Sequence, residues 1–145
     1  MALIEILIDT NAYVEFKRGN QSVIEILRYA QTIGINSVVL GELLAGFAVG
    51  RKIEENQQEL NQFLESSRVK VFTLDEMTAK YYAVIYKQLR NKGKPIPTND
   101  MWIAATAVQH KLTLLSYDKH FMNIDGLLYG QQLSDLLPTP YFKRF

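Results

Sequence analysis

Short apolar runs alternate with longer helical patterns along the chain, and this alternation limits the fold more than any other feature. The runs lie at residues 3–8, 35–39, 69–74 and 112–116, with a shorter one at 127–129. They are continuously apolar, as expected of strands whose sheet is covered on both faces. Strands that alternate with helices form mainly parallel sheets. The sequence therefore predicts an α/β fold, a three-layer sandwich with a mainly parallel central sheet.

The segments between the apolar runs carry helix signals. Ser22 and Glu25 are spaced as in a capping box, which predicts a helix that continues towards Gln31. Asp75 is expected to cap a helix that fades at Asn91. Three further helices are predicted at residues 40–49, 53–66 and 100–110, the last of them capped by Thr98 or Asn99.

The length of 145 residues suits one ordinary domain, expected at residues 1–137 with an extended tail at 138–145. The chain has no cysteine, so it has neither disulfides nor thiolate metal ligands. The first residues lack the basic segment of a signal peptide, and no apolar stretch approaches the roughly 20 residues that span a bilayer. We therefore expect a soluble cytoplasmic protein with no membrane contact.

Four acidic residues fall where such a fold places its functional sites, beyond the carboxyl ends of the strands. Asp9 directly follows the first apolar run, and Glu42 is expected in the first turn after the second. Asp100 is expected in the first turn of the helix that follows the loop at residues 94–97. Asp118 follows the fourth run by two residues. We name these four side chains the acidic quartet.

Each member of the acidic quartet also has a simpler explanation. Asp100 or Glu42 can stabilise a helix start by roughly 0.5–2 kcal/mol as a cap, and Asp118 can open a turn. Asp9 is harder to explain in this way, because an unpaired charge at the end of a buried strand is costly. Asp75 has a similar context and is interpreted as a cap alone.

Carboxylate oxygens are the ligands that Mg²⁺ and Mn²⁺ prefer. One or two such ions can activate water and stabilise the attacking and leaving oxygens of a phosphodiester, so no histidine base is required. Two carboxylates about 5 Å apart at an effective dielectric constant near 20 repel each other by roughly 3 kcal/mol. A convergent cluster would therefore be unstable without a cation.

In this order, the acids and their neighbours resemble the motifs of PIN-domain nucleases, in particular the VapC-type toxins of type II toxin–antitoxin pairs. Four segments carry the resemblance, which runs nearly from end to end: Ile8–Asn11, Val39–Leu43, Pro97–Ala105 and Leu114–Phe121. The third segment is the most specific. Each acid of the quartet is present in its motif.

The resemblance implies a β/α sandwich that hydrolyses RNA with metal-activated water and Mg²⁺ or Mn²⁺ as cofactor. The acidic quartet would be both catalytic and metal-binding, and Thr10 and Ser116 match small hydroxyl positions that support the site. The resemblance also implies a homodimer and a cognate, VapB-like antitoxin whose tail lies along the cleft. Residues 43–63 would help to form the antitoxin groove.

Three lysines, Lys92, Lys94 and Lys119, lie beside the predicted site in the sequence. The simpler interpretation is a solvated helix face or turn, and the functional one is steering of RNA phosphates towards the metals. The net charge of the chain is +1, from 16 basic and 15 acidic residues. If bound metal neutralised the four acids of the quartet, 16 basic residues would face 11 acidic ones, and the rest of the protein would be basic. That balance permits RNA binding without arguing for it.

Other functions are open to the same residues. A phosphatase of the haloacid-dehalogenase type needs a second aspartate two positions after Asp9, where this chain has Asn11. A metal-free ribonuclease would need a histidine base, His110 or His120, and would leave a cyclic phosphate rather than a 3′-hydroxyl. A PIN-like RNA-processing nuclease without an antitoxin and a non-catalytic RNA- or partner-binding module are further alternatives. A pure binder, however, has little use for four converging carboxylates.

Overall fold

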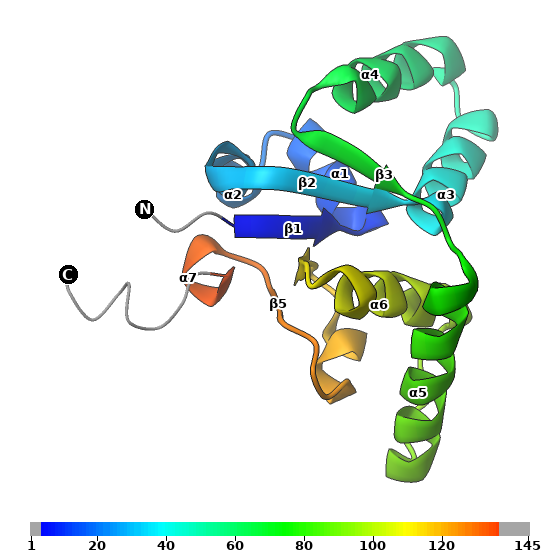
Figure 1. Ribbon diagram of the computed structural model, residues 1–145. Helices are drawn as coiled ribbons and strands as arrows, with labels where there is room; N and C mark the ends of the chain where they lie inside the picture. Colours follow the sequence, from blue (N-terminus) through cyan, green and yellow to red (C-terminus); the bar gives the residue numbers. More distant parts are fainter. Residues whose placement is uncertain (1–3, 137–145) are drawn as a thin grey trace, which may run out of the picture.

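The computed structural model describes residues 4–136, and these form an α/β fold around one five-stranded sheet (Figure 1). All neighbouring strands pair in parallel, in the order β3-β2-β1-β4-β5. The strands are β1 (Ile4–Ile8), β2 (Ala30–Asn36), β3 (Val69–Phe72), β4 (Thr113–Leu115) and β5 (Tyr129–Gly130). The predicted fold class is confirmed, whereas the tail expected at 138–145 lies outside the described residues.

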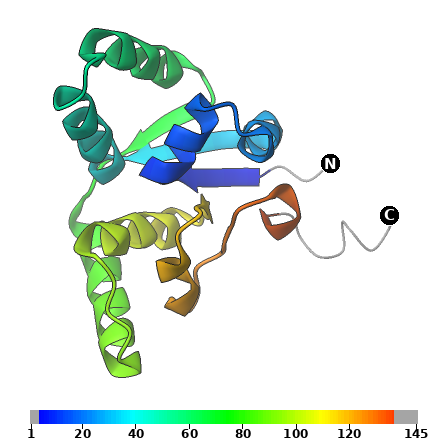
Figure 2. The ribbon, with the colours of Figure 1, turned by 180° about the vertical axis from the view of Figure 1, so that it is seen from behind.

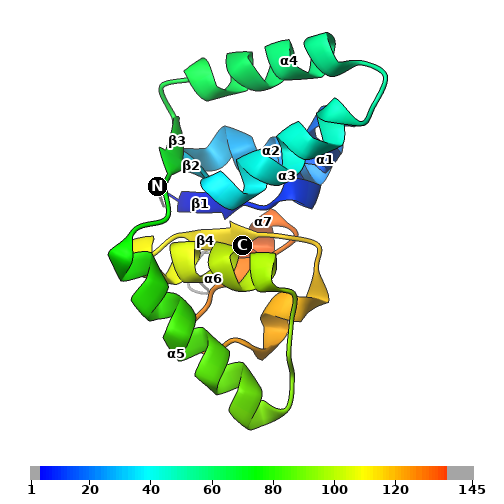
Figure 3. The same cartoon turned by 90° about the vertical axis from the view of Figure 1, so that its right-hand side faces the viewer.

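Helices flank the sheet. They are α1 (Thr10–Lys17), α2 (Gln21–Tyr29), α3 (Ser37–Ala48), α4 (Ile53–Glu65), α5 (Glu76–Lys92), α6 (Thr98–His110), the 3₁₀ helix η1 (Lys119–Asn123) and α7 (Leu133–Leu136). Helices α1 and α2 lie on the face that Figure 2 turns towards the viewer. Figure 3 shows α3 and α4 above β1 and α5 and α6 below it. Within residues 4–136, no helix is long and apolar enough to cross a membrane.

The strand β1 lies in the middle of the sheet and carries the centre of the core. Ile6 and Leu7 have no exposed surface, and Ile8 has almost none. Burying each such side chain stabilises the fold by about 1.5–3 kcal/mol. Because β2 and β4 flank β1 in parallel, their carboxyl ends lie at the same edge as its own. Packing of β1 in the core therefore places Asp9 at the sheet edge where β2 and β4 also end.

The boundary between β2 and α3 differs from the prediction. The strand expected at 35–39 ends at Asn36, and α3 begins at Ser37. The side-chain oxygen of Asn36 accepts a hydrogen bond from the Val39 backbone N at 2.9 Å, which starts the helix in spite of two β-branched residues. Glu42 therefore lies in the second turn of α3 rather than the first.

One helix cap was predicted correctly, and two others differ from the prediction. Asp75 caps α5 as expected, in a capping box with Thr78. The helix predicted from Ser22 is capped instead by Asn20, whose side chain accepts from the backbone N of Ser22 and of the next residue. Helix α6 begins at Thr98 itself and has no side-chain cap. The proline before it lacks an N–H and has a restricted φ, so the helix can begin directly after it.

Two short helices, α1 and α7, are not predicted by the sequence. Helix α1 buries only Ala12 and Tyr13, which is too short an apolar pattern to recognise. It begins because Asp9 accepts a hydrogen bond from the Ala12 backbone N at 2.8 Å. The residue that ends the central strand thus also starts the first helix.

Two glycines should respond oppositely to alanine. Gly93 ends α5 with a φ of +66°, where a Cβ is strained, whereas a Cβ on Gly46 within α3 would meet no atom within 4 Å. Gly93→Ala is expected to lower the free energy of unfolding by about 1 kcal/mol. Gly46→Ala should raise it by about 0.5–1 kcal/mol through better helix propensity. Urea denaturation measures both changes, and two changes of the same sign would contradict this assignment.

Candidate metal centre

A cleft of about 520 Å³ opens where the strand ends meet α1, α3, α6 and η1. Its lining residues are Asp9, Thr10, Asn11, Glu42, Pro97, Thr98, Asn99, Asp100, Ile103, Asp118 and His120. All four members of the acidic quartet therefore line one cleft, although they are separated by up to 109 positions in the sequence.

Asp9 is the most buried member of the quartet, with 5% of its surface exposed. Besides the bond from Ala12, its second carboxylate oxygen accepts from the Ser116 hydroxyl at 2.5 Å. Burial raises the pKa of Asp9 to about 6, and the charges of Asp100 and Asp118 act in the same direction. The two hydrogen bonds only partly oppose this rise. A nearby cation would offset the cost of this buried charge.

Ser116 connects Asp9 to Asp118. Its hydroxyl is fully buried at the end of β4, donates to Asp9 and accepts from the backbone N of Asp118 at 3.0 Å. Asp118 in turn caps η1, because its Oδ1 accepts from the backbone N of His120 at 2.9 Å. One hydroxyl thus orders two acids that come from different strands. Its supporting role was predicted from the motif, and its position is suited to that role.

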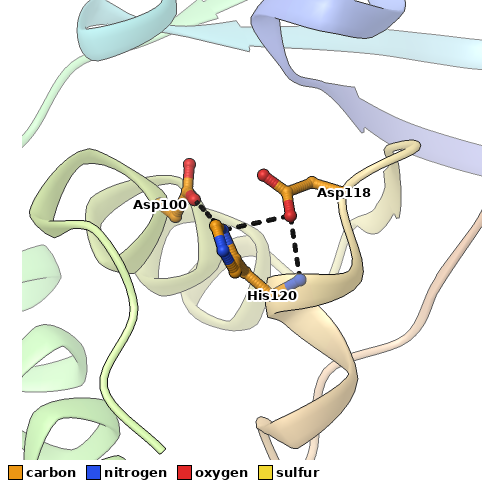
Figure 4. A group of neighbouring side chains, drawn as sticks. All are labelled: Asp100, Asp118 and His120. Carbon is orange, nitrogen blue, oxygen red and sulfur yellow. Dashed lines mark hydrogen bonds and ion pairs between the residues drawn. The ribbon is translucent and has the colours of Figure 1, made fainter.

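His120 lies between two acids of the quartet (Figure 4). Its Nδ1 is 3.0 Å from Asp100 Oδ2 and 3.0 Å from Asp118 Oδ1. One potential ligand atom from each of the three residues lies within 4.8 Å of the other two. The hydrogen bond to Asp100 raises the pKa of His120, while burial raises the pKa of Asp100. These three side chains form the tightest part of the site.

Glu42 approaches the cleft from α3, which lies above β1 in Figure 3, whereas α6 lies below it. Its Oε1 accepts from the Thr10 hydroxyl at 2.7 Å. Since Thr10 directly follows Asp9, this bond connects the acid on α3 to the end of β1. Glu42 is exposed and does not belong to the close group of Asp100, Asp118 and His120.

The donors in the cleft suit a hard divalent cation. The quartet offers carboxylate oxygens, and His120 adds a ring nitrogen. Among the described residues that line the cleft, none is a lysine or arginine that would neutralise the acids from within. The raised pKa values of Asp9 and Asp100 reflect the cost of keeping these charges buried and close together. A divalent cation fits this arrangement of charges.

Part of the site is not predicted by the sequence. Asn11, Thr98 and Asn99 line the cleft but were not proposed as site residues. His120 was considered as a base in a metal-free enzyme and, beside Asp118, either as a solvated surface residue or as one that steers RNA phosphates, but not as a metal ligand. The available signal was its spacing, two residues after an acid that follows a strand, and that spacing is too common to be specific.

The three lysines proposed to bind RNA lie in different surroundings. Lys94 and Lys119 are exposed. The ammonium group of Lys92 is 2.7 Å from a carboxylate oxygen of Asp125 and 2.8 Å from the carbonyl oxygen of Asn123. Lys92 therefore joins the end of α5 to the end of η1 and the residues that follow it. A phosphate would have to compete with this ion pair for Lys92, so Lys94 and Lys119 are better placed.

Comparison with known proteins gives a consistent result. A family model described as the PIN domain matches residues 6–127, which include the whole acidic quartet. The ribonuclease VapC2 of Rickettsia felis is 35% identical over 72% of this chain and 78% of its own length. The toxin FitB of Neisseria gonorrhoeae is 32% identical over 78% of this chain and 87% of its own length. The crystal structure of VapBC2 from Rickettsia felis, bound to a DNA fragment from their promoter, matches with a TM-score of 0.79 and 30% identity, covering 88% of this chain and 98% of that chain.

Without metal, the protein should lose stability as the pH rises through the pKa of Asp9. The folded state keeps this proton up to about pH 6, whereas the unfolded chain releases it near 3.8, so the folded state binds more protons between these values. In EDTA at about pH 7, Asp9→Asn should therefore be more stable than the wild type by at most about 3 kcal/mol. The gain should vanish by about pH 4. Urea denaturation across this pH range measures it.

Asp75→Asn is the matched control for this pH dependence. The pKa of Asp75 is lowered, chiefly by the hydrogen bond from the Thr78 backbone, so its charged form stabilises the folded state. Asp75→Asn should therefore destabilise the protein above the ordinary carboxyl pKa and matter less in stronger acid. A gain from Asp9→Asn that does not change with pH would contradict the assignment.

Asp100→Asn should raise the melting temperature in EDTA by about 2–4 °C, because it removes a charge that faces Asp118. The asparagine keeps an acceptor for the ring N–H of His120, so the hydrogen bond need not be lost. Asp125→Asn is the control, because the Asp125 carboxylate pairs with Lys92 outside the cleft; this variant should bring no such gain. Thermal unfolding in EDTA measures both variants. A clear drop for Asp100→Asn would mean that its charge stabilises the start of α6 more than it repels the other acids.

Proposed function

The chain belongs to the PIN-domain family, and from this membership we propose that it is a metal-dependent endoribonuclease acting as the toxin of a toxin–antitoxin pair. The observation that carries the proposal is the single cleft lined by the acidic quartet. The relatives supply the substrate class and the role, since VapC2 of Rickettsia felis is a ribonuclease and FitB of Neisseria gonorrhoeae is a toxin.

We assign the metal ligands to the acidic quartet. One or two divalent cations bound there, Mg²⁺ or Mn²⁺, would supply the Lewis acidity that activates water and stabilises charge on the phosphodiester. Asp100 and Asp118 are close enough to share an ion, and the ring nitrogen of His120 is a further donor to it. Asp9 and Glu42 extend the set of donors along the same cleft.

The hydrogen bonds of the chain hold these ligands in place before a cation arrives. Ser116 orients the Asp9 carboxylate, and Thr10 orients that of Glu42. A carboxylate oxygen has two acceptor positions, so an oxygen that accepts one hydrogen bond can also coordinate an ion. Preformed ligands reduce the reorganisation needed on binding. This is the supporting role that we propose for the two hydroxyls.

An RNA strand must bring a phosphodiester into a cleft that is itself acidic. Lys94 lies just before α6, which carries Asp100, and Lys119 directly follows Asp118. We propose that these two exposed lysines steer the RNA backbone towards the cleft. Lys92 can contribute only by exchanging Asp125 for a phosphate.

The antitoxin is proposed to bind along α3 and α4, within residues 43–63. Three large apolar side chains are exposed there, those of Leu44, Val49 and Ile53. Leu44 lies two residues after Glu42, so a segment that covers this apolar surface can end close to the cleft. The expected homodimer and the cytoplasmic location stay predictions. A neighbouring antitoxin gene would distinguish a toxin from an RNA-processing nuclease of the same fold.

Calorimetric titration of Mn²⁺ into the chelator-stripped protein tests the metal centre before any RNA target is known. The wild type should bind, and Asp9→Asn and Asp100→Asn should bind about tenfold more weakly or worse, because each loses a charged ligand. Asp125→Asn, a carboxylate outside the cleft, should bind as the wild type does. Equal binding by all four proteins would sink the assignment.

The products of cleavage then separate the chemical alternatives. Hydrolysis by activated water leaves 3′-hydroxyl ends, whereas attack by the RNA's own 2′-hydroxyl leaves a cyclic phosphate. Cyclic phosphate ends formed without metal would favour the histidine-based alternative, in which His120 is the base that lies in the cleft.

A further inference from the structure

Two buried polar side chains, Asn36 and Thr106, join the helix that carries Glu42 to the helix that carries Asp100. Asn36 is 0% exposed and Thr106 1%, and the Asn36 side-chain N donates to Thr106 Oγ1 at 3.1 Å. Neither residue lines the cleft. Yet each lies six positions from an acid, Asn36 before Glu42 and Thr106 after Asp100.

Each partner is also fixed by a second hydrogen bond. The Asn36 oxygen accepts from the Val39 backbone N and caps α3. The Thr106 hydroxyl donates to the Trp102 carbonyl oxygen at 2.9 Å, one turn earlier in α6. The Thr106 proton is thus engaged with Trp102, so its oxygen is the acceptor for the Asn36 amide. The direction of the bond between the helices is therefore determined.

Capping alone does not explain Asn36. A serine or an aspartate caps a helix about as well as an asparagine, and most caps lie at the surface. The side-chain amide of Asn36 adds a donor that points away from its own helix to α6. Among the hydrogen bonds of residues 4–136, it makes the one side-chain bond that joins the start of α3 to α6.

The surroundings make a buried polar pair costly. Val39 and the alanines on either side of Thr106 are buried, so apolar side chains would fill the same space without desolvating an amide and a hydroxyl. A hydrogen bond nevertheless restricts distance and orientation more narrowly than an apolar contact does. The pair therefore contributes a defined spacing between the two helices.

We propose that the Asn36–Thr106 hydrogen bond sets the separation of Glu42 from Asp100 and thereby positions the two sides of the metal centre. This inference rests on the proposed function of the acidic quartet. At about 1.5 Å of rise per residue, each acid lies about 9 Å along its helix from the bond. A small rotation of either helix at that point therefore displaces a carboxylate. Both are positioning residues that touch neither metal nor RNA.

Thr106→Val tests the proposal, because valine has nearly the shape of threonine but cannot accept the hydrogen bond. At a temperature where all proteins are folded, it should bind Mn²⁺ about tenfold more weakly than the wild type. Thr106→Ser keeps the hydroxyl and should bind within about twofold of the wild type. Asn36→Ser is the second variant, since serine still caps α3 but is too short to reach Thr106, and it should weaken Mn²⁺ binding if Thr106→Val does not fold.

Asn20→Ala is the control for stability. Asn20 caps α2 in the way that Asn36 caps α3, but its side-chain hydrogen bonds go to Glu15 and to the start of α2 and do not reach α3 or α6. Its removal should lower the melting temperature and leave Mn²⁺ affinity unchanged. A loss of affinity in Asn20→Ala equal to that in Thr106→Val would mean that general destabilisation, and not positioning, weakens the site.

A double-mutant cycle with Glu42→Gln decides between positioning and general packing. If the bond positions Glu42, then Glu42→Gln should cost less Mn²⁺ affinity in the Thr106→Val background than in the wild type. Additive losses would overturn the positioning role while leaving the metal centre in place. Failure of the wild type itself to bind Mn²⁺ would overturn the proposed function, and the positioning role with it.

Discussion

Asp9 ends the central strand of the sheet, where burial removes water from a carboxylate that also faces two other acids. The position follows from the core: β1 is covered on both faces and flanked by parallel strands, so its last residue emerges among other strand ends. The same side chain caps α1 and receives the hydroxyl of Ser116. The geometry of the cleft and the start of the first helix therefore depend on one buried carboxylate. Its pKa of about 6 records the electrostatic cost.

The cleft is assembled from chain segments that are short and separately held. Ser116 ties the end of β4 to the end of β1, and Thr10 ties Glu42 to the same place. Asn36 and Thr106, which are buried in the core and do not line the cleft, join the start of α3 to α6. Each connection is a hydrogen bond to or from a small polar side chain with little freedom. Repulsion among the acids favours a looser arrangement, and these bonds oppose it until a cation neutralises the charges.

The fold class could be predicted because β1, β2 and β4 are continuous apolar runs, and such runs separated by helices leave few alternatives to a parallel sheet. The boundaries were harder. Val38 and Val39 favour a strand, yet the Asn36 cap makes them helical, since a local hydrogen bond outweighs a weak propensity. Helix α1 escaped prediction because it buries only two side chains. The predicted cap at Thr98 or Asn99 was wrong because the preceding proline lets α6 begin at Thr98.

By itself, the sequence determined which acids converge, because each follows an apolar run or begins a helix, and parallel strands end at one edge of a sheet. Only the tertiary structure decided the rest of the site. His120 reaches Asp100 across a separation of 20 residues, and Asn36 reaches Thr106 across 70. The physical reason is separation along the sequence, because the patterns that predict strands and helices involve only residues a few positions apart. The contacts that order the carboxylates join residues that meet only after the core has formed.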